Sequence, residues 1–341
     1  MESNDFQEIK ELGFTSLIEK FTNYTGEHRD EIEKGIGDDA SLYREHEGHL
    51  TAASSEIFLE GIHFDVTYTP LHHLGYKLVT AAVSDVYAMN SEPIQILVNI
   101  AVPTKYSVQM VEQLYKGIDR ACKDYRVQLT GGDTTASHQI LVVSVTVLGS
   151  SKKEKVIFRN GAKHNDVICV TGDLGSAIAG LRILMREKQE WQQQESEQFR
   201  PELEPYEYVV QRQLVPEARQ DFIHVLSNWE GKPSSMIDVT QGLIADLKEI
   251  AKKSDLGAEI FSPAVPIALE TRTVADEMKE DVDKYAFYGG EDYEMIFTIK
   301  EPEVEKLKAE FEDFSVIGKM SNEFKELRIN TGEDKTIQLD L

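Results

Sequence analysis

The chain has 341 residues, of which 41% are hydrophobic and 28% charged, as expected of a globular protein that can bury a sizeable core. Its 60 Asp and Glu residues outnumber 36 Lys and Arg residues, and the formal net charge of -24 disfavours partners such as nucleic acid or an anionic membrane. The two cysteines exclude a disulfide framework and a cysteine-rich metal site. No signal peptide or membrane span is visible, so we expect a cytoplasmic protein.

The first part of the chain predicts a helix, a turn and two strands. Residues 6–30 have helical spacing of apolar residues followed by a polar connector. The stretch 35–40 reads GIGDDA, and its glycines and adjacent carboxylates suit either a divalent cation or an ordinary turn. Strands are expected over 41–43 and 50–58.

Two helices and two strands are expected next. Apolar periodicity predicts a helix over 70–89 that carries Asp85, an acid that needs a partner such as a metal because its neighbours are small or apolar. A second helix is expected over 107–125, with Ser107 as its N-cap. Strands are expected over 95–102 and 140–148, and the run GGDTT, at a predicted strand end or turn, lies between the second helix and the later strand.

A lysine-rich run near residue 150 predicts a domain boundary that divides the chain into 1–150 and 151–341. After it, 166–172 predicts a strand that turns into a helix, which either binds an anion or is a plain connection. The charged, Gln-rich segment 186–207 predicts a solvated helical excursion or a mobile insert. A strand and turn are expected over 236–243 before another helix, and 295–299 and 302–314 predict a strand and a helix.

Acidic side chains recur at separate predicted turns, strand ends and helices. They are Asp38, Asp39, Glu56, Asp85, Asp133 and Asp238. Oxygen ligands of this kind favour Mg²⁺, and several such ions can hold a nucleotide triphosphate during phosphoryl transfer. No P-loop, kinase-type catalytic loop or nucleophile elbow is present. His63 could contact a ligand or be structural, and Arg159 could grip a phosphate or be an ordinary surface residue.

Six blocks, taken in order, give a family resemblance. The blocks GIGDDA, LEGIHF, SDVYAM, GGDTT, TGDLGSA and GGEDYE resemble those of thiamine-monophosphate kinases, relatives of aminoimidazole ribonucleotide synthetases and selenophosphate synthetases. The resemblance implies an α/β (α+β) fold whose N-terminal mixed-sheet domain forms a β-barrel with a second subunit. It also implies a C-terminal α/β domain and an ATP site in the cleft between the two domains.

The resemblance further implies roles for individual residues in a homodimeric enzyme that uses Mg²⁺ and ATP. The implied Mg²⁺ ligands are Asp39, Ser54, Ser55, Glu56, Asp85, Asp133 and Asp238. The implied ATP contacts are Tyr115, Gly132, Asp133, Arg159 and Thr240, and the implied thiamine monophosphate contacts are His63 and Glu291. Metals and positioning would drive direct in-line transfer of the γ-phosphoryl group, which gives thiamine diphosphate without a catalytic side chain.

The chain departs from the family pattern near these positions. Glu56 and Gln241 each stand where the family usually has aspartate, and Ala82 stands where it has asparagine. The C-terminal aromatic residue that packs on the thiamine ring is missing. An alternative is therefore a catalytically impaired, nucleotide-binding or regulatory paralogue. Other enzymes of the superfamily are less consistent with the sequence, because the first cysteine is Cys122 and the chain ends in leucine.

Overall fold

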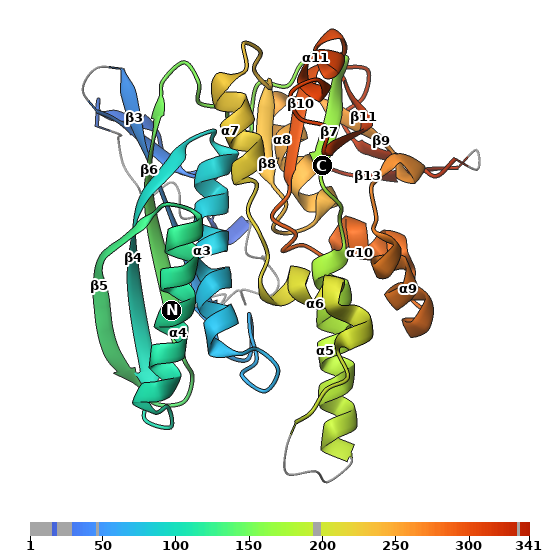
Figure 1. The fold of residues 1–341 in the computed structure, drawn as a ribbon. Helices are drawn as coiled ribbons and strands as arrows, with labels where there is room; N and C mark the ends of the chain where they lie inside the picture. The colour runs from blue at the N-terminus through green and yellow to red at the C-terminus, as the bar shows by residue number, and fades with distance from the viewer. Residues whose placement is uncertain (1–15, 19–28, 46–47, 194–198, 333–334) are drawn as a thin grey trace, which may run out of the picture.

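The computed structural model describes residues 16–18, 29–45, 48–193, 199–332 and 335–341, and it contains two mixed β-sheets that stand side by side among helices (Figure 1). The strands are β1 (Ile32–Lys34), β2 (Ser41–Arg44), β3 (His49–Leu59), β4 (Glu92–Pro103), β5 (Gln128–Ser137), β6 (Val142–Lys152), β7 (Asp166–Thr171), β8 (Ser235–Asp238), β9 (Gly257–Phe261), β10 (Met295–Lys300), β11 (Phe314–Ser321), β12 (Leu327–Asn330) and β13 (Thr336–Leu339). The helices are α3 (Leu71–Ala88), α4 (Val108–Asp124), α5 (Ser176–Gln193), α6 (Glu207–Leu214), α7 (Gln220–Asn228), α8 (Leu243–Ser254), α9 (Leu269–Met278), α10 (Val282–Tyr288) and α11 (Val304–Lys308).

The predicted α/β class with two mixed sheets is confirmed. The helix expected within 6–30 lies outside the described residues, apart from 16–18, which are helical. Among the helices described, none is long and apolar enough to cross a membrane.

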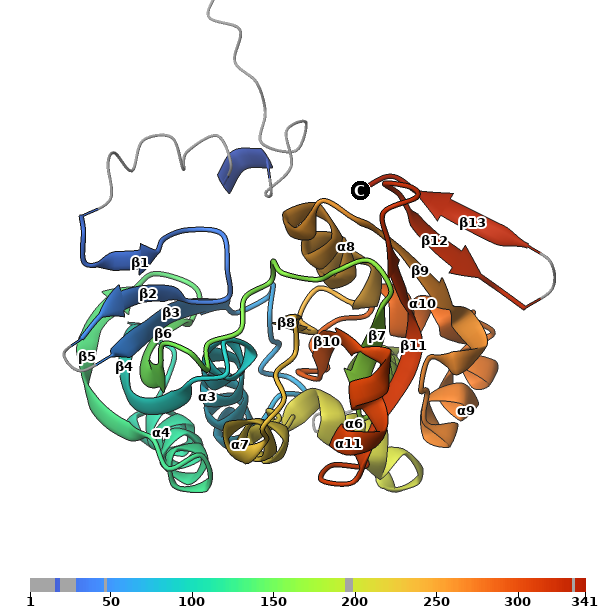
Figure 2. The same cartoon turned by 90° about the horizontal axis from the view of Figure 1, so that it is seen from above.

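The N-terminal sheet has the strand order β1-β2-β3-β6-β4-β5, in which only the β4–β5 pair is parallel. Helices α3 and α4 pack along one face of this sheet (Figure 2). Every residue of α3 from Leu74 to Ala88 is buried, including its polar ones. The reason is that α3 lies between its own sheet and the C-terminal half, so its small and apolar side chains pack on several sides.

The run GGDTT was expected at a strand end or turn, but it lies inside strand β5. Parallel pairing with β4 extends the backbone there, and Gly132 has φ of +145° at its closest approach to β4. A Cβ atom on Gly132 would lie 1.8 Å from the carbonyl oxygen of Val98, so no other residue fits without displacing the strand. From Gln128 to Ala136 every residue of β5 is exposed, which leaves an open sheet edge.

The C-terminal sheet has the order β13-β12-β9-β11-β7-β10-β8. On one face α8 buries Leu247 and Ile250 against strand residues such as Ile237 and Ile296. On the other face α7 and α11 contribute to an apolar cluster that continues into the N-terminal half. The two halves therefore share a core, and α3 touches strand β8 directly.

Three predicted stretches are located more closely by the structure. In the charged segment 186–207, α5 continues to Gln193, as the helical alternative predicts, and a short 3-10 turn leads into α6 at Glu207. The helix expected over 302–314 is a 3-10 turn at 301–303 followed by the short α11, which buries only Val304 and Leu307. The first lysine of the run near 150 belongs to β6, whose pairing with His49 extends the strand to Lys152.

Candidate active site

Three buried carboxylates converge where the two halves of the molecule meet. Asp39 comes from the loop before β2, Asp85 from α3 and Asp238 from the end of β8. One carboxylate oxygen of each lies within 4.8 Å of the others. Carboxylates this close repel one another in a buried setting unless protons or a cation offset their charge.

The adjacent acids Asp38 and Asp39 have different surroundings. Asp38 forms an ion pair with Lys34 at 2.7 Å and accepts the backbone N–H of Arg159 at 2.7 Å. Asp39 accepts the Arg159 guanidinium at 2.5 Å through one oxygen, while its other oxygen is buried without a hydrogen-bond partner. Of the two, Asp39 is therefore the one that offers an unused ligand atom to the cluster.

Two serine hydroxyls hold the other carboxylates in place. Ser54 on β3 donates to Asp85 at 2.5 Å, and Ser84 on α3 donates to Asp238 at 2.5 Å. Ser84 had no role in the sequence analysis, although its place next to Asp85 in a buried helix was a usable signal. Its bond crosses from the N-terminal to the C-terminal half and so fixes their separation at the site.

Burial raises the pKa of Asp39, and it raises the pKa values of Asp85 and Asp238 well above the ordinary value, with the neighbouring carboxylates adding to the effect. Burial also raises the pKa of Glu56, which contacts Asp85. The all-oxygen donor set, the mutual repulsion and the unpartnered oxygen of Asp39 fit a hard divalent cation such as Mg²⁺. Such an ion would displace the protons that the free site holds.

Alternation along β3 divides the predicted ligands Ser54, Ser55 and Glu56 between two faces. Ser54 and Glu56 lie on the face covered by α3, where both contact Asp85. Ser55 is exposed on the opposite face, where its hydroxyl pairs with that of Thr146 at 3.0 Å. Within one chain, Ser55 is therefore not brought to the carboxylate cluster.

Asp133 is also separated from the cluster. The sheet register places it in one row with Asn99, Ser144 and Ile57, on the face that α3 and α4 leave open. Strand β5 is three strands away from β3, about 14 Å across the sheet. Gly132 lies beside Asp133 on β5, and Tyr115 lies on α4 near that strand.

The turn after β8 carries Thr240 and packs against a second motif. Asp246, in the first turn of α8, accepts the backbone N–H groups of Thr240 at 3.0 Å and Gln241 at 3.1 Å. The carbonyl oxygen of Thr240 accepts the N–H of Glu291 at 3.0 Å. Burial raises the pKa of Asp246 to about 7. Asp246 was not among the predicted site residues, although an acid at a helix start, where the helix dipole favours negative charge, is a usable signal.

The predicted substrate residues His63 and Glu291 are close enough to interact: burial acts to raise the pKa of Glu291, whereas Lys77, Gln213 and the charge of His63 lower it. His63 accepts the N–H of Leu59 at 3.1 Å through Nδ1, which fixes the orientation of the ring. Glu291 has φ of +57°, an uncommon conformation for a residue with a side chain. Lys77 forms an ion pair with it at 2.8 Å.

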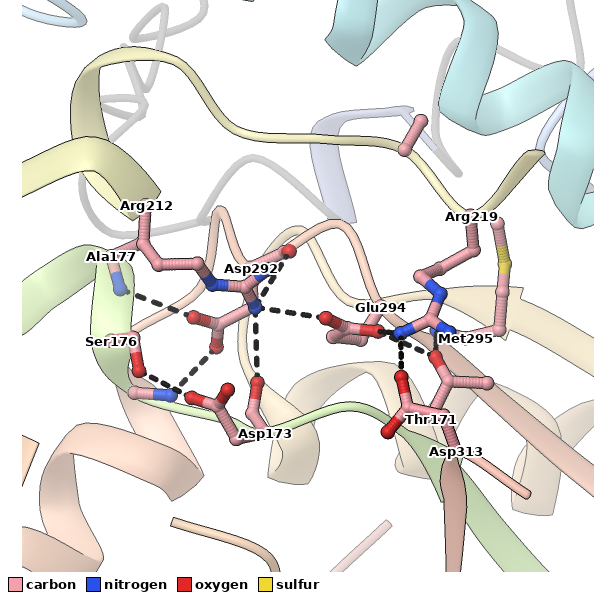
Figure 3. A network of polar contacts seen from close by, with 12 residues as sticks. Thr171, Asp173, Ser176, Ala177, Arg212, Arg219, Asp292, Glu294, Met295 and Asp313 are labelled. Carbon is pink, nitrogen blue, oxygen red and sulfur yellow. Dashed lines mark hydrogen bonds and ion pairs between the residues drawn. The ribbon is translucent and has the colours of Figure 1, made fainter. Parts of the chain in front are cut away.

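Glu291 lies on the loop between α10 and β10. A buried network of charged residues holds the part of this loop that follows Glu291 (Figure 3). Arg212 donates to Glu294 at 2.9 Å and Arg219 donates to its other oxygen at 3.0 Å. Asp292 accepts the N–H of Gly175 at 2.9 Å at the start of α5. These contacts join the sequence blocks TGDLGSA and GGEDYE. The two blocks therefore lie together, at the start of α5 and on the loop before β10.

Two family descriptions cover most of the chain. Residues 37–151 match "AIR synthase related protein, N-terminal domain", and residues 163–329 match "AIR synthase related protein, C-terminal domain". The gap between the two matches contains the end of β6 and the connection that carries Arg159.

Individual relatives are more specific. The thiamine-monophosphate kinase of Bacillus subtilis is 34% identical over 285 residues, which cover 83% of this chain and 82% of that protein. That of Aquifex aeolicus is 31% identical over 293 residues, which cover 86% of each chain. The solved structure "AaThiL complexed with AMPPCP and TMP" is similar with a TM-score of 0.81 and 27% identity, covering 98% of this chain and 99% of that one.

Proposed function

We propose that this chain, which belongs to the thiamine-monophosphate kinase family, transfers the γ-phosphoryl group of ATP directly onto thiamine monophosphate. The observation that carries the proposal is the convergence of Asp39, Asp85 and Asp238 within 4.8 Å, at the junction of the two family domains. A similar solved structure holds both an ATP analogue and TMP, which supports the same pair of substrates here.

Asp39, Asp85 and Asp238 would hold Mg²⁺, with Glu56 beside Asp85 as a further ligand. Bound there, Mg²⁺ supplies charge neutralisation between phosphate oxygens and the acidic protein during transfer. Ser54 and Ser84 orient two of these carboxylates, so the ligand oxygens are already positioned before a nucleotide arrives.

The remaining roles fall to positioning residues. Arg159 faces Asp39 and carries a positive charge suited to a phosphate of ATP, and Thr240 lies on the turn that follows Asp238. His63 and Glu291 would orient thiamine monophosphate. The terminal P–O bond of ATP breaks as an oxygen of the acceptor phosphate bonds to the same phosphorus, which yields ADP and thiamine diphosphate without a phosphorylated protein.

A product assay tests this proposal. The purified protein is incubated with ATP, Mg²⁺ and thiamine monophosphate, and thiamine diphosphate is separated by chromatography. We expect product with the native chain, and a loss of at least about a hundredfold in rate for Asp85→Asn. Asp119→Asn is the matched control, because Asp119 is an exposed acid on α4 that pairs with Lys123.

The second candidate is a nucleotide-binding paralogue with impaired catalysis. It is favoured by Gln241, which is exposed on the turn after β8 where the family resemblance leads one to expect an acid. Calorimetry separates the two candidates. ATP binding without thiamine diphosphate formation would support the paralogue and reject the kinase.

A homodimer is the second part of the proposal, with Asp133 acting in the site of the partner subunit. Asp133 lies on an open sheet face, far from the carboxylates of its own chain, and Ile57 on the same face is 55% exposed. The exposed strand β5 and this apolar residue suit pairing with a second copy of the sheet. Ser55 shares that face and would meet the partner's β5.

Subunit mixing tests the trans arrangement. Asp133→Asn and Asp85→Asn proteins, each inactive alone, are unfolded together and refolded as a mixture. A heterodimer then has one site with both aspartates intact, so activity should return to about a quarter of the native value by random pairing. If Asp133 acts within its own chain, every site stays defective and mixing restores nothing.

A further inference from the structure

Helix α3 presents a polar stripe to the C-terminal half of the molecule. Lys77, Thr80 and Ser84 follow one another at spacings of three and four residues, which places them on the same helix face. All three are buried, with exposures of 4%, 0% and 0%. Lys and Thr in such a setting require specific partners, because an unpaired polar group is costly in a protein interior.

Each member of the stripe contacts a different point of the C-terminal half. Ser84 donates to Asp238 at 2.5 Å, in the carboxylate cluster. Thr80 donates to the carbonyl oxygen of Pro216 at 3.1 Å. Lys77 donates to Glu291 at 2.8 Å and to the carbonyl oxygen of Gln213 at 3.0 Å. Ser84 and Lys77 are two helical turns apart, about 10 Å along the axis.

The charge of Lys77 acts on a carboxylate in an unusual backbone position. Glu291 has φ of +57°, and Gly290 and Tyr293 beside it also have positive φ. The loop is anchored beyond Glu291 by Arg212 and Arg219 through Glu294 (Figure 3). Lys77 holds Glu291 itself through the ion pair. The Glu291 side chain is still 31% exposed, so a ligand can reach it.

We infer that Lys77 is a positioning residue for the acceptor substrate: its ion pair holds the Glu291 side chain in place relative to the carboxylate cluster, which Ser84 joins to the same helix. The inference deepens the proposed function and rests on its assignment of Glu291 to thiamine monophosphate. A carboxylate held in this way suits a cationic or hydrogen-bond-donating part of the acceptor, and thiamine carries both.

The electrostatics agree with the geometry. Burial acts to raise the pKa of Glu291, but the charge and hydrogen bond of Lys77 outweigh it and hold that pKa below the ordinary value. A hydrogen bond from Gln213 and the charge of His63 also lower the pKa of Glu291. Burial raises the pKa values of Tyr68 and Tyr293, and the charge of Glu291 adds to both rises. Without Lys77, only the Gln213 hydrogen bond and the charge of His63 would oppose burial, so the pKa of Glu291 would rise.

The first test needs no substrate. The Glu291 carboxyl titration is followed by carbon NMR of the free protein, assigned by difference from Glu291→Gln. In Lys77→Met the pKa of Glu291 should rise, and in Lys77→Arg it should stay low. Thr80→Val is the matched control, since it removes a buried bond of the same stripe without touching Glu291, and it should leave the titration unchanged. An unchanged titration in Lys77→Met would overturn the inference.

The second test uses kinetics. In Lys77→Met the KM for thiamine monophosphate should rise about tenfold to a hundredfold. This KM should fall again as the pH is raised, because Glu291 then ionises without Lys77. The KM for ATP should change less than about twofold. In the Glu291→Gln background, Lys77→Met should add almost nothing. Equal rises in both KM values, or full additivity with Glu291→Gln, would indicate a merely structural role and reject the inference.

The two tests separate the inference from the proposed function. If the native chain neither binds nor phosphorylates thiamine monophosphate, the proposed function fails, while the NMR titration still decides whether Lys77 controls Glu291. If the native chain is active and Lys77→Met shows native values in both tests, the inference alone fails. Thermal unfolding of each variant shows whether it is folded. If Lys77→Met is not folded, Lys77→Arg is compared with the native protein in its place.

Discussion

At the scale of single residues, small differences in neighbours separate acids that look alike in sequence. Asp38 is neutralised by Lys34, whereas Asp39 faces Asp85 and Asp238 and keeps one buried oxygen without a partner. The pKa of Asp39 is raised by burial although Arg159 opposes the change. The chemistry available to each carboxylate therefore follows from what lies around it, not from the residue type.

Glu56 is one methylene longer than the aspartate usual in the family, and it contacts Asp85 on the α3 side of the sheet. If it is a working ligand, Glu56→Gln should lower turnover at least about a hundredfold, because a neutral amide cannot offset the metal charge. Glu56→Asp, the conservative control, should retain or increase turnover. The rate of thiamine diphosphate formation is the measurement, and native turnover in Glu56→Gln would remove Glu56 from the site.

Gln241 tests a different position of the same site. Its backbone N–H is held by Asp246 and its side chain is exposed, so a carboxylate there would be solvated and free to reach a metal or phosphate-bound ion. We expect Gln241→Asp to raise turnover several-fold at low Mg²⁺ if this position limits activity. The Mg²⁺ dependence of the rate is compared with that of Gln241→Glu. If the native protein, Gln241→Asp and Gln241→Glu show the same dependence of rate on Mg²⁺ concentration, position 241 does not limit the reaction.

At the scale of elements, α3 and β5 have contrasting roles. Helix α3 is buried on nearly all sides and carries Lys77, Ser84 and Asp85, so one rigid element sets the spacing of the site. Strand β5 is exposed along almost its whole length and carries Gly132 and Asp133. In the proposed dimer the first element organises a site within its chain, and the second completes the site of a neighbour.

Gly132→Ala tests the geometry of β5. The added Cβ would lie 1.8 Å from the Val98 carbonyl oxygen at a φ of +145°, so β5 must separate from β4. We expect a loss of at least about 2 kcal/mol in the free energy of unfolding, measured by urea denaturation, together with weaker dimerisation. Gly131→Ala is the matched control, since its Cβ would meet only the Leu97 side chain at 3.3 Å. Equal stability of the two variants would contradict the close approach.

At the scale of the whole molecule, the buried carboxylates lower the stability of the fold at neutral pH. The folded chain buries acids whose pKa values are raised, Asp85 and Asp238 well above the ordinary 3.8 and Asp246 to about 7. Between the ordinary pKa of 3.8 and the raised pKa of each group, these three carboxyl groups hold more protons in the folded state than in the unfolded state. This sign means that raising the pH removes stability, by about 1.4 kcal/mol per pH unit for each additional proton held.

We accordingly expect the unfolding temperature of the metal-free protein to fall as the pH rises from about 5 through 7, where Asp246 ionises. Added Mg²⁺ should reverse this trend, since it binds the deprotonated cluster and stabilises the folded state. Calorimetry with and without a chelator measures both effects. Asp85→Asn should flatten the metal-free pH dependence, and a native protein whose metal-free stability rises over this range would contradict the raised pKa values.

The sequence by itself determined the class of the fold and many of its elements. Apolar periodicity placed α3 and α4, and the N-cap at Ser107 is formed by its hydroxyl, which accepts the N–H of Met110. Strands β3, β4, β6, β7 and β10 lie where β-branched and alternating runs predicted them. These features are local, because each depends on side chains within a few positions of one another. The ordered motifs were enough to indicate the family.

Only the tertiary structure decided which residues meet. The run GGDTT became a strand because β4 pairs with it, and Ser55 and Asp133 lie on the face of the sheet opposite to Glu56 because of strand register. Lys77 and Ser84 gained roles only when α3 packed against the C-terminal half. Such contacts join segments more than a hundred residues apart in most cases, and neither spacing nor propensity along the chain encodes their distances.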